Sequence, residues 1–485
     1  MVNEMETLKE KTAKGLFWGA INSGATQFLN FVIGIFLLRI LSVDDYGIVG
    51  MIAIFTLIAG NLQDSGFTTA LVNGQDITEE DYNSVFWFST TISLSLYVIL
   101  FFSAPLIADF FHQPCLIPLS RFVFITFVLS AIGISHNAFM VRKIMAKERA
   151  IISIVALCLS GIIGITSALS GLGYWSLAFQ QVSYIFITDI GRLYYVRWLP
   201  KLHFSVGPIK RMFSFSYKIL ITTIINTIGN NILTVVFGRL FKPKEVGIYT
   251  QANKWNTMAS SLITNTISST TQPVLSSVRT DKEREKQVFR KIMRFTAFLS
   301  FPCMFGIAIV AKELTLIVIT AKWLESVPLL QVLAIGGAFL PFVSIYNNLT
   351  FSHLRSDIFM WVSTAQLAFQ LLIIYVTYSY GIMAMVLAYT FFNVLWLGVW
   401  QYFAHKLIGL RLSEMLKDIM PFFLIAAGVM AFTYIITLSI TNLVVLLFAR
   451  IVLAVVLYGG IMKLSHAKIF EESVEYLFKK KRKTS

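Results

Sequence analysis

The sequence predicts an all-α integral membrane protein with about 14 transmembrane helices. The 485-residue chain is 56% hydrophobic and only 13% charged, and its mean hydropathy is +0.73. Its apolar residues form runs of about 20, which is long enough to cross a hydrocarbon core of about 30 Å. Lipid offers the backbone no hydrogen-bond partner, so such runs form helices. A soluble globular protein is excluded by this composition.

The expected helices follow one another with short connections, and none of these connections is large enough to hold a catalytic domain. In chain order the helices cover residues 16–41, 46–63, 83–103, 117–140, 151–169, 174–196, 212–237, 247–271, 295–311, 328–350, 358–378, 382–404, 419–439 and 443–464. Thr78 and Asp81 in the stretch TEED predict an N-cap that opens the third helix. The N-terminal stretch MVNEMETLKEKTAKG has no apolar segment before a small-residue cleavage site, so we expect no cleaved signal peptide.

Lys and Arg residues gather in the connections that share a side with the N-terminus. By the positive-inside rule this places both termini in the cytoplasm. The net charge of +15 then reflects topology and contact with anionic membrane lipids, and it does not indicate nucleic-acid binding. The basic run 479–483 is interpreted in the same way. Residues 279–294 alternate in charge, which favours a solvated cytoplasmic helix over a specific lipid site.

An offset of 200 residues reveals an internal repeat between residues 30–50 and 230–250. The pairs that match are Asn30 with Asn230, Arg39 with Arg239, Gly47 with Gly247 and Ile48 with Ile248. The repeat predicts two pseudo-symmetric lobes of six helices, a common plan among transporters. The predicted parts are an N-lobe (1–197), an interlobe linker (198–211), a C-lobe (212–405), two extra helices (406–464) and a basic cytoplasmic tail (465–485).

Polar residues concentrate in the first two helices of each predicted lobe. Most of residues 253–272 are Asn, Ser, Thr, Gln or Lys, although the segment is long enough to be a membrane span. A single Ser or Thr in a span usually makes an interhelical hydrogen bond, but this concentration favours a hydrated cavity. The neutral residues expected to line the cavity are Gln27, Asn30, Asn230, Asn253, Asn256, Ser260 and Thr264.

Four basic residues are candidates for a cationic lining that binds phosphate, because ammonium and guanidinium groups satisfy phosphate oxygens. They are Arg39, Arg239, Lys218 and Lys254. A basic residue near a span's centre costs about 2.5–3.5 kcal/mol on insertion scales and is seldom kept without a use. The alternative is that these side chains extend to lipid headgroups.

Asp64 and Asp189 are candidates for ion coupling. Asp189 could instead pair with Arg192, three residues later on the same helix. The six His residues are dispersed, without metal-ligand spacing. We find no catalytic constellation and expect no metal and no cofactor.

Several stretches resemble the polysaccharide transporter family of the multidrug/oligosaccharidyl-lipid/polysaccharide exporter superfamily. They are LSVDDYGIVGM, DSGFTTALVNGQDITEEDYNSVFW, GLGYWSLAFQQ, VGIYTQANKWNTM, QPVLSSV and AKWLESVPLLQVLAIGG, which extend from residue 41 to residue 337. The sequence is most similar to lipopolysaccharide exporters of the colanic-acid and teichuronic-acid type, which are O-antigen-flippase-like.

The resemblance implies a flippase of the bacterial inner membrane with fourteen helices. Its expected substrate is a polyprenyl-pyrophosphate-linked oligosaccharide, moved by alternating access for cell-surface polysaccharide biosynthesis. Its expected neighbours in the pathway are a polysaccharide polymerase and glycosyltransferases. Two alternatives stay open, a multidrug exporter of the same superfamily and a membrane polysaccharide polymerase or ligase.

Overall fold

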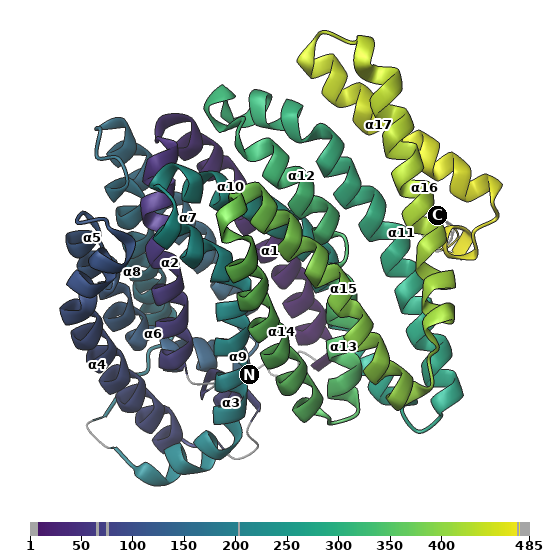
Figure 1. Ribbon diagram of the computed structural model, residues 1–485. Helices are drawn as coiled ribbons and strands as arrows, with labels where there is room; N and C mark the ends of the chain where they lie inside the picture. Colours follow the sequence, from purple (N-terminus) through teal and green to yellow (C-terminus); the bar gives the residue numbers. More distant parts are fainter. Residues whose placement is uncertain (1–7, 65–66, 74–76, 202–203, 473–474, 476–485) are drawn as a thin grey trace. The chain divides into compact units, whose positions relative to one another are not determined.

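The computed structural model describes residues 8–64, 67–73, 77–201, 204–472 and 475, and all regular structure in this part of the chain is helical (Figure 1). The chain divides into two compact units, unit 1 (Met1–Gly247) and unit 2 (Ile248–Ser485). The helices that begin in unit 1 are α1 (Leu8–Ile40), α2 (Val43–Asp64), α3 (Phe67–Asn73), α4 (Glu79–Phe111), α5 (Leu116–Val123), α6 (Ile125–Arg142), α7 (Ala146–Leu169), α8 (Trp175–Tyr195), α9 (Val206–Leu240) and α10 (Pro243–Val278).

Helix α10 begins at the end of unit 1 and continues into unit 2. The α-helices that follow it are α11 (Lys282–Leu314), α12 (Ser326–Gly337), α13 (Leu340–Ser352), α14 (Ser356–Thr377), α15 (Ile382–Ile408), α16 (Leu412–Ile436) and α17 (Leu443–Leu464). Four short helical turns of other types complete the set: η1 (Thr315–Ile319), η2 (Ala321–Trp323), η3 (Tyr378–Tyr380) and η4 (Thr437–Ser439).

Each of the fourteen predicted spans coincides with a long helix or with two consecutive helices. The predicted spans 117–140 and 328–350 are the ones that divide, into α5 with α6 and into α12 with α13. Within the described residues, 11 helical segments are long and apolar enough to cross a membrane. Helices α8, α9 and α10 are not among these segments. The all-helical membrane fold is confirmed, and the count of fourteen crossings stays a prediction.

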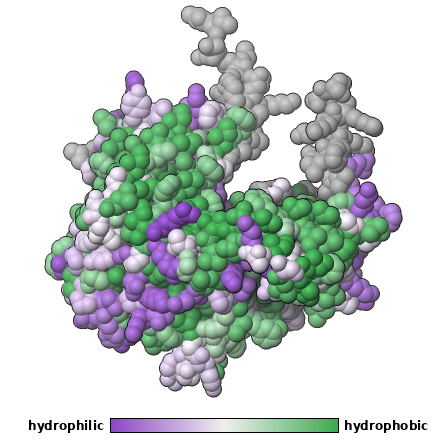
Figure 2. Space-filling model, turned by 90° about the horizontal axis from the view of Figure 1, so that it is seen from above, coloured by the Kyte–Doolittle hydropathy of each residue, from purple (hydrophilic) through white to green (hydrophobic). Residues whose placement is uncertain are grey.

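The exterior of the protein suits a lipid environment. Large apolar side chains are exposed along the long helices, including Phe102 at 73%, Leu106 at 70% and Val455 at 67%. Figure 2 shows apolar side chains over much of the visible face, with polar ones confined to patches. A soluble protein would not expose apolar surface this extensive.

The expected linker 198–211 is not entirely loop, because α9 already begins at Val206. Pro208 therefore lies in the first turn of a helix. Proline is tolerated there, because the first N–H groups of a helix have no acceptor within the helix.

The predicted N-cap at Thr78 is confirmed. Its side chain accepts from the backbone of Asp81 and the Asp81 carboxylate accepts from the backbone N–H of Thr78, a complete capping box.

The matched glycines of the repeat make reciprocal close contacts at the N-terminal ends of α2 and α10. A Cβ on Gly47 would overlap the carbonyl oxygen of Pro243, and a Cβ on Gly247 would overlap that of Val43. Helix backbones approach this closely in membranes where small residues lie between them. Each glycine therefore contacts the start of the other's helix, as expected for equivalent residues of a repeat. The predicted lobe boundaries stay a prediction.

Unit 2 has one extensive core, in which Phe301 of α11, Phe342 of α13 and Trp400 of α15 are fully buried. Helix α10 contributes Ile263 and Ile267 to this core. In unit 1, α1 packs on α7, and α7 packs on α8. These cores fix which side of α1 and which side of α10 remains exposed.

Candidate functional site

In unit 1, the predicted cavity residues of α1 are Gln27, which is half-buried, and Asn30, which is exposed. Ser23, which was not predicted to line the cavity, is exposed beside them. Their spacing of four and three residues places them in one row along the helix. Toward the C-terminal end of the helix, Ile33 and Leu37 continue this side and are buried. An exposed Asn in the middle of a membrane helix requires water, because lipid cannot satisfy its amide.

Helix α9 has a similar exposed position at Asn230, the repeat partner of Asn30. Its neighbour Thr227 accepts a hydrogen bond of 2.8 Å from the Nδ2 of Asn61 on α2. This bond joins two helices of unit 1, so the polarity of Asn61 and Thr227 has a structural explanation. Gln63 is also structural: it is buried, donates to the carbonyl oxygen of Phe127 and accepts from Ser130.

Arg239 stabilises the end of another helix. Its Nη1 lies 2.6 Å from the carbonyl oxygen of Phe110 and 2.6 Å from Nε2 of His112, at the C-terminus of α4. A cation at this position interacts favourably with the negative end of the helix dipole. Arg239 is still exposed, as is its repeat partner Arg39 in the last turn of α1. The predicted cationic residue Lys218 and the predicted ion-coupling residue Asp64 have side chains outside the described residues.

In unit 2, the structure differs from the prediction for α10. The side chains of Asn256 and Ser260 are only 5% and 3% exposed, so they do not open on a hydrated space. Ile263 lies seven residues after Asn256 and three after Ser260, and therefore on the same face, which packs into the core. The Oδ1 of Asn256 fits against Gly337, where a Cβ would overlap it.

Thr264 and Asn253 also belong to this inward side. Both are half-buried, and the hydroxyl of Thr264 donates to the carbonyl oxygen of Ser260 at 2.9 Å. Lys254 is exposed. It has no hydrogen-bond or ion-pair partner among the residues that the structure describes, so its ammonium group is available to water or to a ligand.

Asp189 pairs with Arg192 on α8. The carboxylate accepts from Nη1 of Arg192 at 2.9 Å, and its side chain is 6% exposed. It is enclosed by Gly133 of α6, where a Cβ would overlap it. The pairing that the sequence left as an alternative is therefore confirmed.

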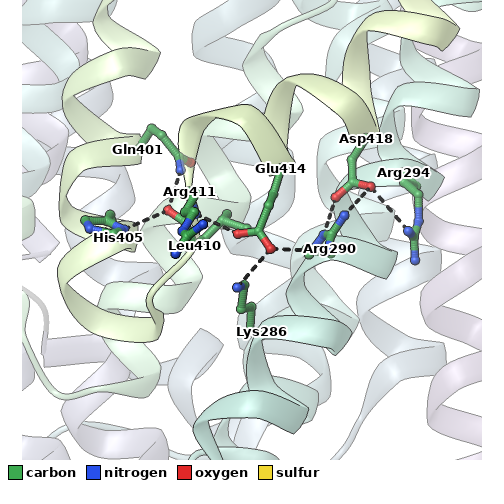
Figure 3. Close-up of polar contacts among 9 residues, drawn as sticks. All are labelled: Lys286, Arg290, Arg294, Gln401, His405, Leu410, Arg411, Glu414 and Asp418. Carbon is green, nitrogen blue, oxygen red and sulfur yellow. Dashed lines mark hydrogen bonds and ion pairs between the residues drawn. The ribbon is translucent and has the colours of Figure 1, made fainter.

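Three charged clusters in unit 2 were not predicted from the sequence. The first joins the N-terminal part of α11 to α16: Lys286 and Arg290 contact Glu414, and Arg290 and Arg294 contact Asp418 (Figure 3). The interpretation of residues 279–294 as a merely solvated helix is wrong for these three basic residues. They are at most 39% exposed and are paired with carboxylates.

The second cluster is a buried ion pair between Arg450 of α17 and Glu313 of α11, 2.8 Å apart. The third pairs His353, the C-cap residue of α13, with the buried Glu285 of α11, and its Nε2 lies 2.9 Å from that carboxylate. Partners 68 or more residues apart give no local sequence signal. Only the presence of a basic or acidic residue inside an apolar helix could have indicated these pairs from the sequence. Such a residue usually has a partner or a function.

A polar cluster without charge joins α14 to α15. Gln366 and Gln370 each donate to the Oδ1 of Asn393 at 2.8 Å. The spacing of four residues between the two glutamines is a signal that could have identified this face. Within the described residues, no group of three His, Cys, Asp or Glu side chains could hold a metal ion.

Comparisons with solved structures show which proteins share this fold. The chain aligns over 95% of its length with the lipid II flippase MurJ in an inward closed conformation, covering 99% of that chain with a TM-score of 0.71 and 14% identity. It also aligns with an inward-facing multidrug resistance transporter of the MATE family, with a TM-score of 0.63 over 82% of this chain and 99% of that one, at 13% identity.

Comparisons with curated proteins point to surface polysaccharides. The chain is 24% identical to the teichuronic acid biosynthesis protein TuaB of Bacillus subtilis over 88% of this chain and 90% of that one. It is 23% identical to the lipopolysaccharide biosynthesis protein WzxC of Escherichia coli over 73% and 72%. It is also 27% identical to a membrane protein of the cps region of Klebsiella pneumoniae over 68% and 69%.

The sequence profile of a family described as polysaccharide biosynthesis protein matches residues 36–328, which is more than half of the chain. The matched region runs from α1 to α12 and includes all of α10. The chain is therefore a member of this family of polysaccharide biosynthesis proteins.

Proposed function

We propose that the protein is a flippase that moves a polyprenyl-pyrophosphate-linked oligosaccharide across the bacterial inner membrane by alternating access. The family and the relatives TuaB and WzxC support a role in polysaccharide biosynthesis. The fold, shared with the lipid II flippase MurJ, supports transport of a lipid-linked sugar. The product would be used to build a cell-surface polysaccharide.

The observation that carries the proposal is the exposure of polar side chains in the middle of long helices. Asn30 of α1, Asn230 of α9 and Lys254 of α10 are all exposed. A lysine in hydrocarbon costs about 2.5–3.5 kcal/mol on insertion scales, and lipid cannot satisfy an amide, so each of these positions suits contact with water. A lipid-linked oligosaccharide combines a hydrated sugar, an anionic pyrophosphate and an apolar tail, and it needs both a polar and an apolar surface.

We propose that the pyrophosphate meets the basic residues Lys254, Arg39 and Lys218. Arg239 is also a candidate, although its guanidinium already contacts the end of α4. We propose Asp64 and Asp189 as ion-coupling candidates, and the carboxylate of Asp189 already pairs with Arg192.

We propose further that the protein works as a transporter rather than as an enzyme and that both termini lie in the cytoplasm. The basic run 479–483, which lies outside the described residues, would contact anionic lipid headgroups there. The predicted lobes would rock about the segment near residue 200, opening the path first to one side and then to the other. Partners in the pathway would be glycosyltransferases and a polymerase.

A deletion strain tests the function directly. We expect single lipid-linked repeat units to accumulate at the cytoplasmic leaflet and surface polysaccharide to be lost. A polymerase defect would instead leave single repeat units at the cell surface. Unchanged polysaccharide with increased drug susceptibility would contradict the proposal in favour of a multidrug exporter.

A further inference from the structure

A second row of polar side chains runs along α10, on the side of the helix that does not face the core of unit 2. It consists of Lys254, Thr257, Ser261, Asn265 and Gln272, spaced by three, four, four and seven residues. This spacing keeps all five on one narrow face of the helix. All are exposed except Ser261, which is half-buried. We call these five residues the α10 outer row.

Several hydroxyl groups of α10 have hydrogen-bond partners, including Ser268, which lies on the same face between Asn265 and Gln272 and bonds to Ser344 of α13. Ser260, Thr264 and Thr271 donate to backbone carbonyl groups of α10 itself, as hydroxyl groups in membrane helices commonly do. In the outer row, Ser261 alone does so. The other four side chains have no hydrogen-bond or ion-pair partner in the described part of the chain.

The environment of the outer row must be aqueous during at least part of the transport cycle. An amide left without a partner in hydrocarbon is strongly unfavourable, and the row contains the two amides of Asn265 and Gln272. The row extends over 18 residues, or about 27 Å at 1.5 Å per residue. That length is close to the thickness of the hydrocarbon core, about 30 Å.

We propose that the α10 outer row binds the carbohydrate part of the transported molecule, with Lys254 contacting the adjacent phosphate group. This inference rests on the proposed function and deepens it. Hydroxyl and amide groups donate and accept hydrogen bonds at once, as sugar hydroxyls do. The row contains no carboxylate that would repel a phosphate, and its single cation lies toward the N-terminal end of α10. The sugars therefore extend from Lys254 toward Gln272.

Thiol labelling tests the exposure of the outer row, with a charged, membrane-impermeant methanethiosulfonate as the probe. The full-length protein would first have Cys115, Cys158 and Cys303 replaced by alanine, and this background must still export glycan. We expect Ser261→Cys and Asn265→Cys to be labelled, because thiolate forms only where water reaches the sulfur. The matched control is Ser260→Cys, one residue away and 3% exposed in the native protein, which should stay unlabelled. Equal labelling at positions 260 and 261 would overturn the proposal.

Glycan export at equal expression tests the binding role. We expect Thr257→Val and Asn265→Leu each to lower the export rate about two- to tenfold, the effect of losing one hydrogen bond. The matched control is Thr270→Val, the same isosteric change at an exposed threonine that bonds to its own helix, and it should export normally. Normal export by both row variants would overturn the proposal.

Failure of the proposed function can be distinguished from failure of the inference about the outer row. If the wild-type protein moves no lipid-linked oligosaccharide, the proposed function fails, and the assignment of a sugar to the outer row fails with it. If the wild-type protein is active and the row variants are equally active, only the inference about the outer row fails.

Discussion

Lys254 of α10 and Arg450 of α17 are both basic residues inside long membrane helices, but they differ in burial and in hydrogen-bond partners. Arg450 is 5% exposed; its guanidinium donates to Glu313 at 2.8 Å, to the carbonyl oxygen of Ile309 at 2.8 Å and to Thr437 at 3.1 Å. Lys254 is exposed and has no partner among the described residues. A cation with its donors satisfied by the protein holds helices together, whereas a cation without a protein partner is available for a substrate.

The comparison extends to whole regions of unit 2. Helices α16 and α17 are joined to α11 by charges at two separate places, the Arg450–Glu313 pair and the Asp418 cluster of Figure 3. Helix α10 instead has four side chains of its outer row without partners in the described part of the chain. The charges near α16 and α17 therefore stabilise the fold, and we propose that these four side chains of α10 serve transport.

Arg450→Met should destabilise the protein by about 3–5 kcal/mol, because it leaves Glu313 buried without a partner. Thermal unfolding of the purified protein in detergent measures the effect. The double variant Arg450→Met with Glu313→Leu should recover most of the loss, since an apolar pair of similar volume is often as stable as a buried ion pair. A double variant as unstable as the single one would contradict the assignment of this pair.

Asp418→Asn should destabilise by about 1–3 kcal/mol, the range for hydrogen bonds to charged groups. The native carboxylate accepts from Arg290 at 2.6 Å and from Arg294 at 3.2 Å. The control is Asp357→Asn, whose partner Arg355 is 52% exposed. An exposed pair of this kind contributes little to stability, because water and salt screen it. Similar losses for the two variants would show that burial does not strengthen the Asp418 cluster.

Asn256→Ala should change the free energy of unfolding by only about 1 kcal/mol or less. Its Oδ1 is buried without a hydrogen-bond partner in the described residues, so removing it relieves a desolvation cost that offsets the lost packing. Glycan export should remain normal, because the side chain faces the core. A selective loss of export would restore Asn256 to the transport path and contradict the placement of α10.

Lys254→Met should leave stability within about 0.5 kcal/mol, as for other surface changes without a partner. It should nevertheless reduce glycan export strongly at equal expression. Lys254→Arg should retain part of the export, because guanidinium also binds phosphate. Normal export by Lys254→Met would remove this residue from the substrate site.

The sequence predicted the helices well because apolar runs and short connections are local properties of the chain. It also indicated α10 as the unusual helix, since no other span is as rich in Asn, Ser and Thr. It failed to identify which polar face of α10 is buried. That choice depends on Gly337, a residue of α12 that leaves room for Asn256, and such a contact is not local. The sequence did hold one clue, because Ile263 and Ile267 continue the face of Asn256 and Ser260.

Transfer of a lipid-linked oligosaccharide in reconstituted vesicles tests the central claim most directly. The measurement is the fraction of the molecule in the outer leaflet over time, in vesicles with wild-type protein, with Lys254→Met and without protein. We expect rapid transfer with the wild-type protein and slow transfer with Lys254→Met. Transfer by the wild-type protein no faster than in empty vesicles would contradict the proposed function.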